Sequence, residues 1–332
     1  MTRKKKIIIV LTLALIIGGI IFLAKGSKKP SEEVKHLKKP NIPDFTKESY
    51  PIESSLNQSD FSFPKEMPVL IVKPKPGFLP DEAKSIAKSS GFDREPKITQ
   101  DINRSTTYIF NTDKASMVIY LRDRIIDYTL NIEPEVVNKQ LSPDAIENIA
   151  KDFLIKSLQL PEEQIQFFNL LFLLDTESEE VAPLDSQEDA RVYQVNFSPK
   201  ISNRPIITLD PKNTPYSVQI LRDGTPFAAH TTDLGEIKES FEIYKIMSFS
   251  EFNSSLPNAK LITLGDSNLS SYFPGKGGIQ KLLVNQVDLA YFMDAPQSEI
   301  FQPIFLLTAD AILTGESETK KAILYLPAVS GI

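Results

Sequence analysis

The residues that come nearest to a catalytic motif are Gly265, Asp266 and Ser267. A Gly-Asp-Ser block carries the nucleophile in one family of lipase-like hydrolases, where a histidine late in the chain acts as the general base. No histidine follows His230 in this chain, so that base is missing. The block also lies far from the N-terminus, where that family carries it. We therefore interpret it as a turn at the end of a strand.

Residues 274–278, Pro-Gly-Lys-Gly-Gly, suggest a phosphate-binding loop. The Walker pattern requires a glycine five positions before Gly-Lys and a serine or threonine after the lysine. Ser270 occupies the first of these positions and Gly277 the second. The segment fails both requirements, and we interpret it as a surface loop.

His230 precedes Thr231, Thr232 and Asp233 and could in principle form a His–Asp pair that activates a serine. No spacing rule supports such a pair, and we expect a structural or solvated histidine at the end of a strand. The chain has one other histidine, His36, and no cysteine, which excludes three-histidine zinc sites, thiolate sites and disulfides. We expect no catalytic, cofactor-binding or metal-binding residues, and no cofactor.

Seven acidic residues gather between positions 175 and 189 with no basic residue among them. Carboxylate oxygens are the ligands that calcium prefers outside the cell, but the Asp-x-Asp-x-Asp-Gly loop is absent. A solvated insertion between strands is the simpler interpretation, and calcium binding stays open. The acidic residues are Asp175, Glu177, Glu179, Glu180, Asp185, Glu188 and Asp189.

Aromatic side chains lie in the strands that we predict on either side of this acidic run. We expect them in the core, although a Phe or Tyr at an edge strand could anchor a peptide by strand addition. These residues are Phe167, Phe168, Phe172, Tyr193 and Phe197.

Three helices are predicted between short strands. The first begins at Pro80 and ends at Gly91, the second has Ser142 as its cap and Pro143 at its first position, and the third has a capping box at residues 248–251. Alternating apolar patterns predict the strands. They cover residues 69–72, 108–110, 117–121, 125–132, 166–174, 191–197, 206–209, 217–221, 225–230, 282–292, 303–307 and 322–326.

A short internal repeat connects two of these strands. Residues 118–123 read Val-Ile-Tyr-Leu-Arg-Asp, and residues 218–223 read Val-Gln-Ile-Leu-Arg-Asp. From residue 67 onward the elements divide into three units, each a helix followed by about three antiparallel strands. A helix packed on one face of a curled sheet buries one side of each element. The predicted fold class is therefore α+β, with an N-terminal transmembrane helix followed by repeated helix-plus-antiparallel-sheet units.

Residues 7–24 form an uncharged apolar segment of 18 residues, long enough to cross a hydrocarbon core of about 30 Å. The small-x-small site that would favour a cleaved signal peptide is poor here. The basic head, residues 1–6, favours a cytoplasmic N-terminus and an extracytoplasmic C-terminal region. Residues 25–66 contain five prolines and are predicted to form a stalk.

Charge is divided unevenly along the chain. Residues 1–39 carry ten Lys/Arg against two Asp/Glu, a net charge of +8; because the whole chain carries −6, residues 40–332 carry −14. An acidic domain is a poor polyanion binder, so we expect no nucleic acid partner. The basic residues next to the anchor either contact anionic lipid headgroups or serve topology and solubility.

Three places carry a resemblance to a known family: residues 142–146 with 153–154, residues 287–292 with 302–305, and residues 325–329. With helices followed by a meander of strands behind a single anchor, the chain resembles PepSY-like domains, and more specifically the extracytoplasmic regulators of the YycH/YycI type. The resemblance spans residues 67–330 in layout and implies a non-enzymatic regulatory domain, which in that family acts on a membrane sensor kinase.

We therefore predict a single-pass cell-membrane protein whose extracytoplasmic part binds a protein, peptide or envelope partner. A scaffold subunit of an envelope or secretion assembly is the alternative, and a serine hydrolase using Ser267 is the alternative that the sequence favours least. The predicted parts are the cytoplasmic head 1–6, the anchor 7–24, the stalk 25–66, a first α+β unit 67–140 and a second α+β region 141–332, which we divide into units 141–240 and 241–332.

Overall fold

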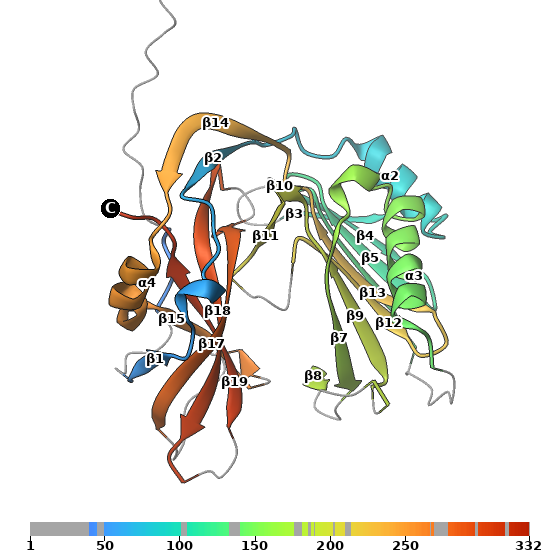
Figure 1. Cartoon of the computed structure of the whole chain (residues 1–332). Coiled ribbons are helices and arrows are strands. Elements are labelled where there is room, and N and C mark those ends of the chain that lie inside the picture. Colours follow the sequence, from blue (N-terminus) through green and yellow to red (C-terminus); the bar gives the residue numbers. More distant parts are fainter. Residues whose placement is uncertain are drawn as a thin grey trace, which may run out of the picture. The chain divides into compact units, whose positions relative to one another are not determined.

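Two large β-sheets make up most of the folded chain, and only three α-helices accompany them in the described residues (Figure 1). The predicted α+β fold of repeated PepSY-like units is wrong, because the chain is mostly β-sheet and strands from different predicted units pair with one another. The structure is a computed structural model. It describes residues 40–44, 50–100, 105–132, 140–175, 181–184, 187–188, 190–201, 203–209, 214–265, 267–268, 278–295, 298–315 and 319–331.

The ten-stranded sheet is built around two hairpin strands of fourteen residues each, β17 (Ile279–Phe292) and β18 (Ile300–Leu313). On one face of β17, Val287, Leu289 and Tyr291 are buried. Strands β1 and β11 run parallel to β17, and the other pairs are antiparallel. The remaining strands are β1 (Ile52–Ser54), β2 (Glu66–Lys73), β10 (Lys200–Ile201), β11 (Arg204–Ile207), β14 (Glu236–Lys245), β15 (Lys260–Leu264), β16 (Ser267–Asn268) and β19 (Lys320–Pro327).

The nine-stranded sheet is antiparallel throughout and has the order β3-β4-β5-β6-β13-β12-β9-β7-β8. Helices α2 (Pro80–Ser89) and α3 (Pro143–Lys156) cover one of its faces (Figure 1) and share one hydrophobic core with it. The strands are β3 (Lys97–Gln100), β4 (Thr106–Asn111), β5 (Ala115–Tyr120), β6 (Ile125–Leu130), β7 (Phe167–Asp175), β8 (Val181–Leu184), β9 (Val192–Phe197), β12 (Tyr216–Leu221) and β13 (Pro226–Thr232).

Two segments of this sheet follow the same order of elements. Helix α2 precedes β3, β4, β5 and β6, and helix α3 precedes β7, β9, β12 and β13. The last strands, β6 and β13, pair in the middle of the sheet, and β3 and β7 are the outermost of the eight strands. The two copies of the short internal repeat lie at corresponding places, in β5 and β12 and the turns that follow them. The two segments are thus halves of one sheet, and they are not separate units.

The helices begin as their sequences predict. The hydroxyl of Ser142 accepts a hydrogen bond of 3.3 Å from the backbone N–H of Ala145 at the start of α3. Helix α4 (Phe249–Ser255) follows a capping box in which Ser248 and Glu251 bond each other's backbone N–H groups. Such caps satisfy N–H groups that have no partner within the helix.

The part of the predicted stalk from residue 50 to residue 66 packs against the ten-stranded sheet. Strand β1 pairs with residues 282–284 of β17, and Phe61 lies 5.2 Å from Phe305 between ring centroids. Phe61 and Phe63 contact the core of this sheet with Tyr50 and Leu56. These residues belong to the folded region.

Two short connections run between the sheets, one from β2 to α2 and the other from β13 to β14. Each carries a glycine at a close approach of two backbones: a Cβ on Gly77 would lie 2.7 Å from the carbonyl oxygen of Leu121, and one on Gly235 would lie 2.5 Å from that of Lys73. Gly235 also has a φ of +79°, which favours glycine. Both connections therefore require glycine at these positions, because a Cβ atom would collide with the neighbouring backbone.

An ion cluster joins the same two connections. The carboxylate of Asp233 accepts hydrogen bonds from Nε of Arg124 at 2.8 Å, from Nζ of Lys75 at 3.1 Å and from the N–H of Gly235 at 2.9 Å. The guanidinium of Arg124 also bonds Glu82 at 3.1 Å. The Asp233 side chain is 7% exposed and the Arg124 side chain 13%, so this is a largely desolvated ion pair.

No helix among the residues that the structure describes is long and apolar enough to cross a membrane. The predicted anchor, residues 7–24, lies outside the described residues.

Candidate binding surface

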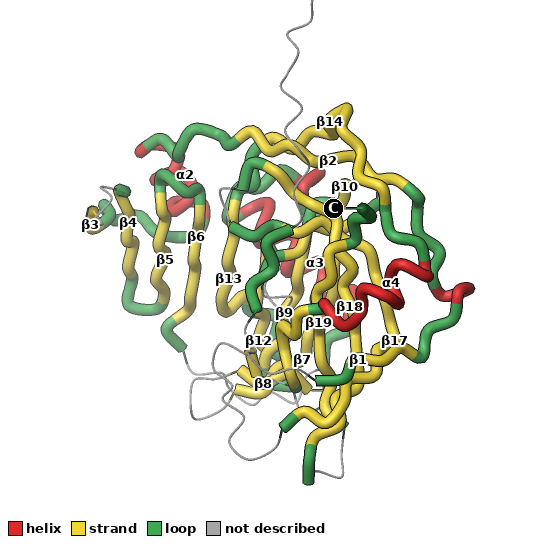
Figure 2. Tube along the Cα trace, turned by 90° about the vertical axis from the view of Figure 1, so that its left-hand side faces the viewer, coloured by secondary structure: helices red, strands yellow, loops and turns green. Residues whose placement is uncertain are grey.

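The face of the nine-stranded sheet that carries no described helix is called here the helix-free face. In β4, β5 and β6 its side chains alternate with those buried under α2 and α3, because successive residues of a strand point to opposite faces. Figure 2 shows β3, β4, β5, β6 and β13 side by side, with β3 at the outer edge. The partly exposed apolar residues on this face are Ile109, Val118, Tyr120 and Ile125.

Those four side chains form a continuous apolar patch across three strands. Ile109 lies directly opposite Val118 in the β4–β5 pair, and Tyr120 lies opposite Ile125 in the β5–β6 pair. Directly opposite residues of an antiparallel pair have Cβ atoms about 5 Å apart, which places their side chains in contact range. The helix-free face therefore presents apolar surface, with Tyr120 36% exposed.

A row of polar side chains continues from this patch across five strands. Each residue of the row lies directly opposite the next in the strand register. Exposure decreases over the first four residues of the row, from 42% for the first two side chains to 7% for the third residue and 0% for the fourth, and the fifth is partly exposed. The row consists of Asp127 in β6, His230 in β13, Ser217 in β12, Asn196 in β9 and Asn169 in β7.

The last two residues of the row, Asn196 and Asn169, belong to a chain of side-chain amides. Nε2 of Gln219 donates to Oε1 of Gln194 at 3.1 Å, Nε2 of Gln194 donates to Oδ1 of Asn196 at 3.0 Å, and Nδ2 of Asn196 donates to Oδ1 of Asn169 at 2.7 Å. Buried amides are stable only when they are hydrogen-bonded. These amides pair with one another and stabilise the register of β7, β9 and β12.

His230 contacts a partner at each ring nitrogen. Its Nδ1 lies 2.7 Å from Oδ1 of Asp127, and its Nε2 lies 3.1 Å from Oγ1 of Thr232. Carboxylate, imidazole and hydroxyl thus follow one another as in a hydrolase triad. Thr232 is only 3% exposed, however, so its hydroxyl is not accessible to a substrate. Asp127 lies 103 residues before His230 in the sequence, and only the strand register reveals the pair.

The residues of the Gly-Asp-Ser block follow β15, as expected of a turn at a strand end. Gly265 has a φ of +57°, and Ser267 lies in the two-residue strand β16. Asp266 and residues 274–277 of the predicted surface loop lie outside the described residues. Ser267 lies in a strand of the ten-stranded sheet, and His230 lies in a strand of the nine-stranded sheet.

The acidic run is described only in part. Asp175 ends β7, and Glu188 lies in a turn before β9, while Glu177, Glu179, Glu180, Asp185 and Asp189 lie outside the described residues. The described residues contain no group of three metal-ligating side chains. The aromatic residues differ in burial. Tyr193 and Phe197 are fully buried as predicted, whereas Phe167 is 37% exposed. Phe168 packs against an apolar cluster of the ten-stranded sheet.

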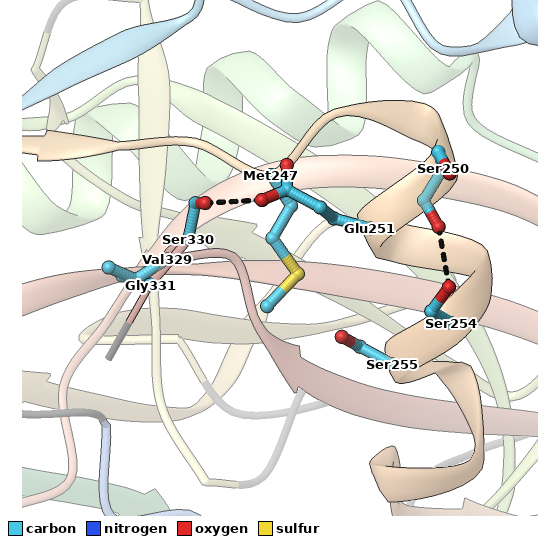
Figure 3. Close-up of a pocket in the computed structure, with 8 residues that line it drawn as sticks. All are labelled: Met247, Ser250, Glu251, Ser254, Ser255, Val329, Ser330 and Gly331. Carbon is cyan, nitrogen blue, oxygen red and sulfur yellow. Dashed lines mark hydrogen bonds between the residues drawn. The ribbon is translucent and has the colours of Figure 1, made fainter.

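A polar pocket of about 260 Å³ lies between α4 and the C-terminal segment (Figure 3). The carboxylate of Glu251 accepts hydrogen bonds from Ser330 Oγ at 2.5 Å and from the N–H and hydroxyl of Ser248 at 2.7 Å each. These bonds lower the pKa of Glu251 to about 2. A carboxylate bonded in this way is a poor proton acceptor at neutral pH, and no histidine lines the pocket. The lining residues are Met247, Ser250, Glu251, Ser254, Ser255, Val329, Ser330 and Gly331.

Comparisons with known proteins do not assign this surface. No protein-family model matches the chain, and no curated protein matches it. Among solved structures, the chain is similar to an uncharacterized protein from Eubacterium rectale ATCC 33656, with 14% sequence identity and a TM-score of 0.49. That similarity covers 81% of this chain and 86% of the other.

Proposed function

We propose that this chain is a non-enzymatic binding protein that is held at the cell membrane by residues 7–24 and recognises a partner polypeptide outside the cytoplasm. The partner belongs to the membrane or the cell envelope. Recognition takes place on the nine-stranded sheet, and the ten-stranded sheet provides the larger part of the structural core.

The observation that carries this proposal is the apolar patch on the helix-free face. Exposed apolar surface bordered by polar groups is typical of protein-binding sites. Here Val118 and Tyr120 lie at the centre of the patch, and Asp127 and His230 lie at its border. The patch stands on paired strands, so a partner would meet a preorganised surface and little conformational entropy would be lost on binding.

The side-chain chemistry supports binding over turnover. The only histidine among the described residues bonds Asp127 and the inaccessible Thr232, and the carboxylate of the polar pocket is held in its ionised form. General acid–base catalysis requires a group that can exchange a proton with a bound substrate. In the described part of the chain we find no such group beside an accessible nucleophile.

Site-specific photo-crosslinking in intact cells tests the proposal. A photoreactive amino acid at Tyr120 of the full chain is expected to give a discrete crosslinked product with an envelope or membrane protein. The matched control is the same substitution at Glu163, which is exposed in the 3₁₀ turn Glu162–Gln164. A product from both positions, or from neither, contradicts the proposal. A sensor kinase as the product favours regulation, and a component of an envelope assembly favours a scaffold.

Two further measurements separate the alternatives. Ester hydrolysis by the purified full chain is expected to be absent, and turnover that disappears in Ser267→Ala establishes the hydrolase instead. Deletion of residues 2–24 is expected to release the protein from the membrane fraction, because it removes the apolar segment. A deleted form that stays with the membrane contradicts the proposed anchor.

A further inference from the structure

Strand β3 ends the nine-stranded sheet on the side opposite β8, and no described strand pairs with its outer edge. Within the described residues, β4 is the only strand that pairs with it. The side chains of Lys97 and Gln100 are exposed, and Ile98 is 58% exposed. An edge strand of this kind presents main-chain groups that can pair with another chain.

The strand register shows which groups point outward. The N–H of Leu121 donates to the carbonyl of Thr106, so the even-numbered residues of β4 form their main-chain bonds with β5. Bonding alternates along an antiparallel strand, which leaves the odd-numbered residues of β4 to bond Lys97 and Thr99. The N–H and C=O groups of Ile98 and Gln100 therefore point away from the sheet.

In the other half of the same sheet, the strand that corresponds to β3 has an additional strand paired to its outer edge. Strand β7 corresponds to β3, because each is the first strand after its helix and the outermost of its four. Residues 172–175 of β7 pair with the four-residue strand β8, which runs antiparallel to them. The fold thus accepts an additional short antiparallel strand at the position that is open on β3.

We infer that the outer edge of β3 binds an extended segment of the partner polypeptide as an additional antiparallel strand. This inference rests on the proposed function and specifies the class of ligand. The added strand would bond the outward N–H and C=O groups of Ile98 and Gln100, as in recognition by strand addition.

The side chains of β3 also predict the sequence of the segment. The residue opposite Ile98 shares its face of the sheet and is expected to be apolar, since it would cover an exposed isoleucine. The next residue lies opposite Lys97, whose side chain is exposed, and is expected to be acidic. The segment therefore carries an apolar residue next to an Asp or Glu.

The test uses the full chain in detergent and a phage-displayed library of random ten-residue peptides. Enriched peptides are synthesised with a fluorophore, and their Kd is measured by anisotropy. Gln100→Pro removes one outward N–H, and its matched control Gln100→Ala removes the side chain but keeps that N–H. We expect Gln100→Pro to weaken binding about tenfold or more and Gln100→Ala to change it less than about twofold.

A second measurement tests the inference even if the proline variant does not fold. Lys97→Glu is expected to weaken binding of the enriched peptide, and a peptide with Lys in place of its acidic residue is expected to restore it. The inference is overturned if the library yields no enriched peptide, or if the peptide binds Gln100→Pro and Gln100→Ala with equal Kd. It is also overturned if the peptide with Lys in place of its acidic residue does not restore binding to Lys97→Glu. Crosslinking from Tyr120 in cells is independent of these outcomes, so a failure at β3 is distinguishable from a failure of the proposed function.

Discussion

Nε of Arg124 donates a hydrogen bond of 2.8 Å to the carboxylate of Asp233, which lies 109 residues later in the chain. Arg124 belongs to the turn between β5 and β6, and Asp233 to the connection between β13 and β14. Lys75, in the connection from β2 to α2, bonds the same carboxylate. One buried carboxylate therefore joins both connections to the turn between β5 and β6 of the nine-stranded sheet.

Asp233→Asn is expected to lower the free energy of unfolding by about 3 kcal/mol, because it leaves the largely buried guanidinium of Arg124 without a carboxylate. Urea denaturation of the full chain measures this loss. The control is Asp152→Asn, which breaks an exposed pair with Lys156 and should cost less than about 0.5 kcal/mol. Equal losses of unfolding free energy in the two variants would show that the Asp233 cluster stabilises the fold no more than an exposed ion pair does.

The contribution of Asp233 is also expected to depend on pH. Burial alone would raise the pKa of its carboxyl, but hydrogen bonds from Gly235, Arg124 and Lys75 hold the pKa below its usual value. The stabilisation is therefore complete above the unfolded pKa of about 3.9 and is lost as the pH falls through the lower folded pKa. The difference in unfolding free energy between the native chain and Asp233→Asn should shrink below about pH 4. A difference that stays constant down to pH 2 would contradict this assignment.

The buried amide chain gives a prediction for Asn196. Asn196→Ala removes an acceptor from Gln194 and a donor from Asn169, and should lower the free energy of unfolding by about 2 kcal/mol. Thr129→Ala, on the same face but exposed, should change it by less than about 0.5 kcal/mol. Thermal and urea denaturation of both variants test the difference, and a neutral Asn196→Ala would mean that the network does not stabilise the sheet.

Glu251 is expected to remain ionised down to about pH 2, because Ser330 and Ser248 donate hydrogen bonds to its carboxylate. Ser330→Ala removes the bond that contributes most and should raise the pKa toward the ordinary glutamate value of about 4.3. An NMR titration of the Glu251 carboxyl carbon measures both values. The same pKa in the native chain and in Ser330→Ala would rule out the contact between the C-terminal segment and α4.

Local signals were sufficient to predict all three described helices. Pro80, Ser142 and the capping box at Ser248 act within a few residues of themselves, so their effect can be read without knowing the rest of the fold. The long strand β17 was predicted for a similar reason, since its apolar residues alternate over many positions.

The fold class was predicted wrongly because strand pairing is not local. Strand β14 escaped prediction, since charged residues interrupt its alternation and its register with β2 shifts between Glu239 and Ile243. The pairing of β6 with β13 and of β2 with both β14 and β18 joins segments that belong to different predicted units. Short-range periodicity says that a strand exists but not which strand lies beside it.

For the candidate surface, too, some features could be predicted from the sequence and others required the structure. The sequence by itself determined that the chain has few groups for acid–base chemistry, an acidic region after residue 40 and an apolar segment at residues 7–24. Only the tertiary structure decided that Asp127 meets His230, that Tyr120 lies on a face without a described helix, and that no described strand pairs with the outer edge of β3 while β8 pairs with β7. Composition and periodicity belong to the chain, whereas register and exposure arise only when distant strands pair.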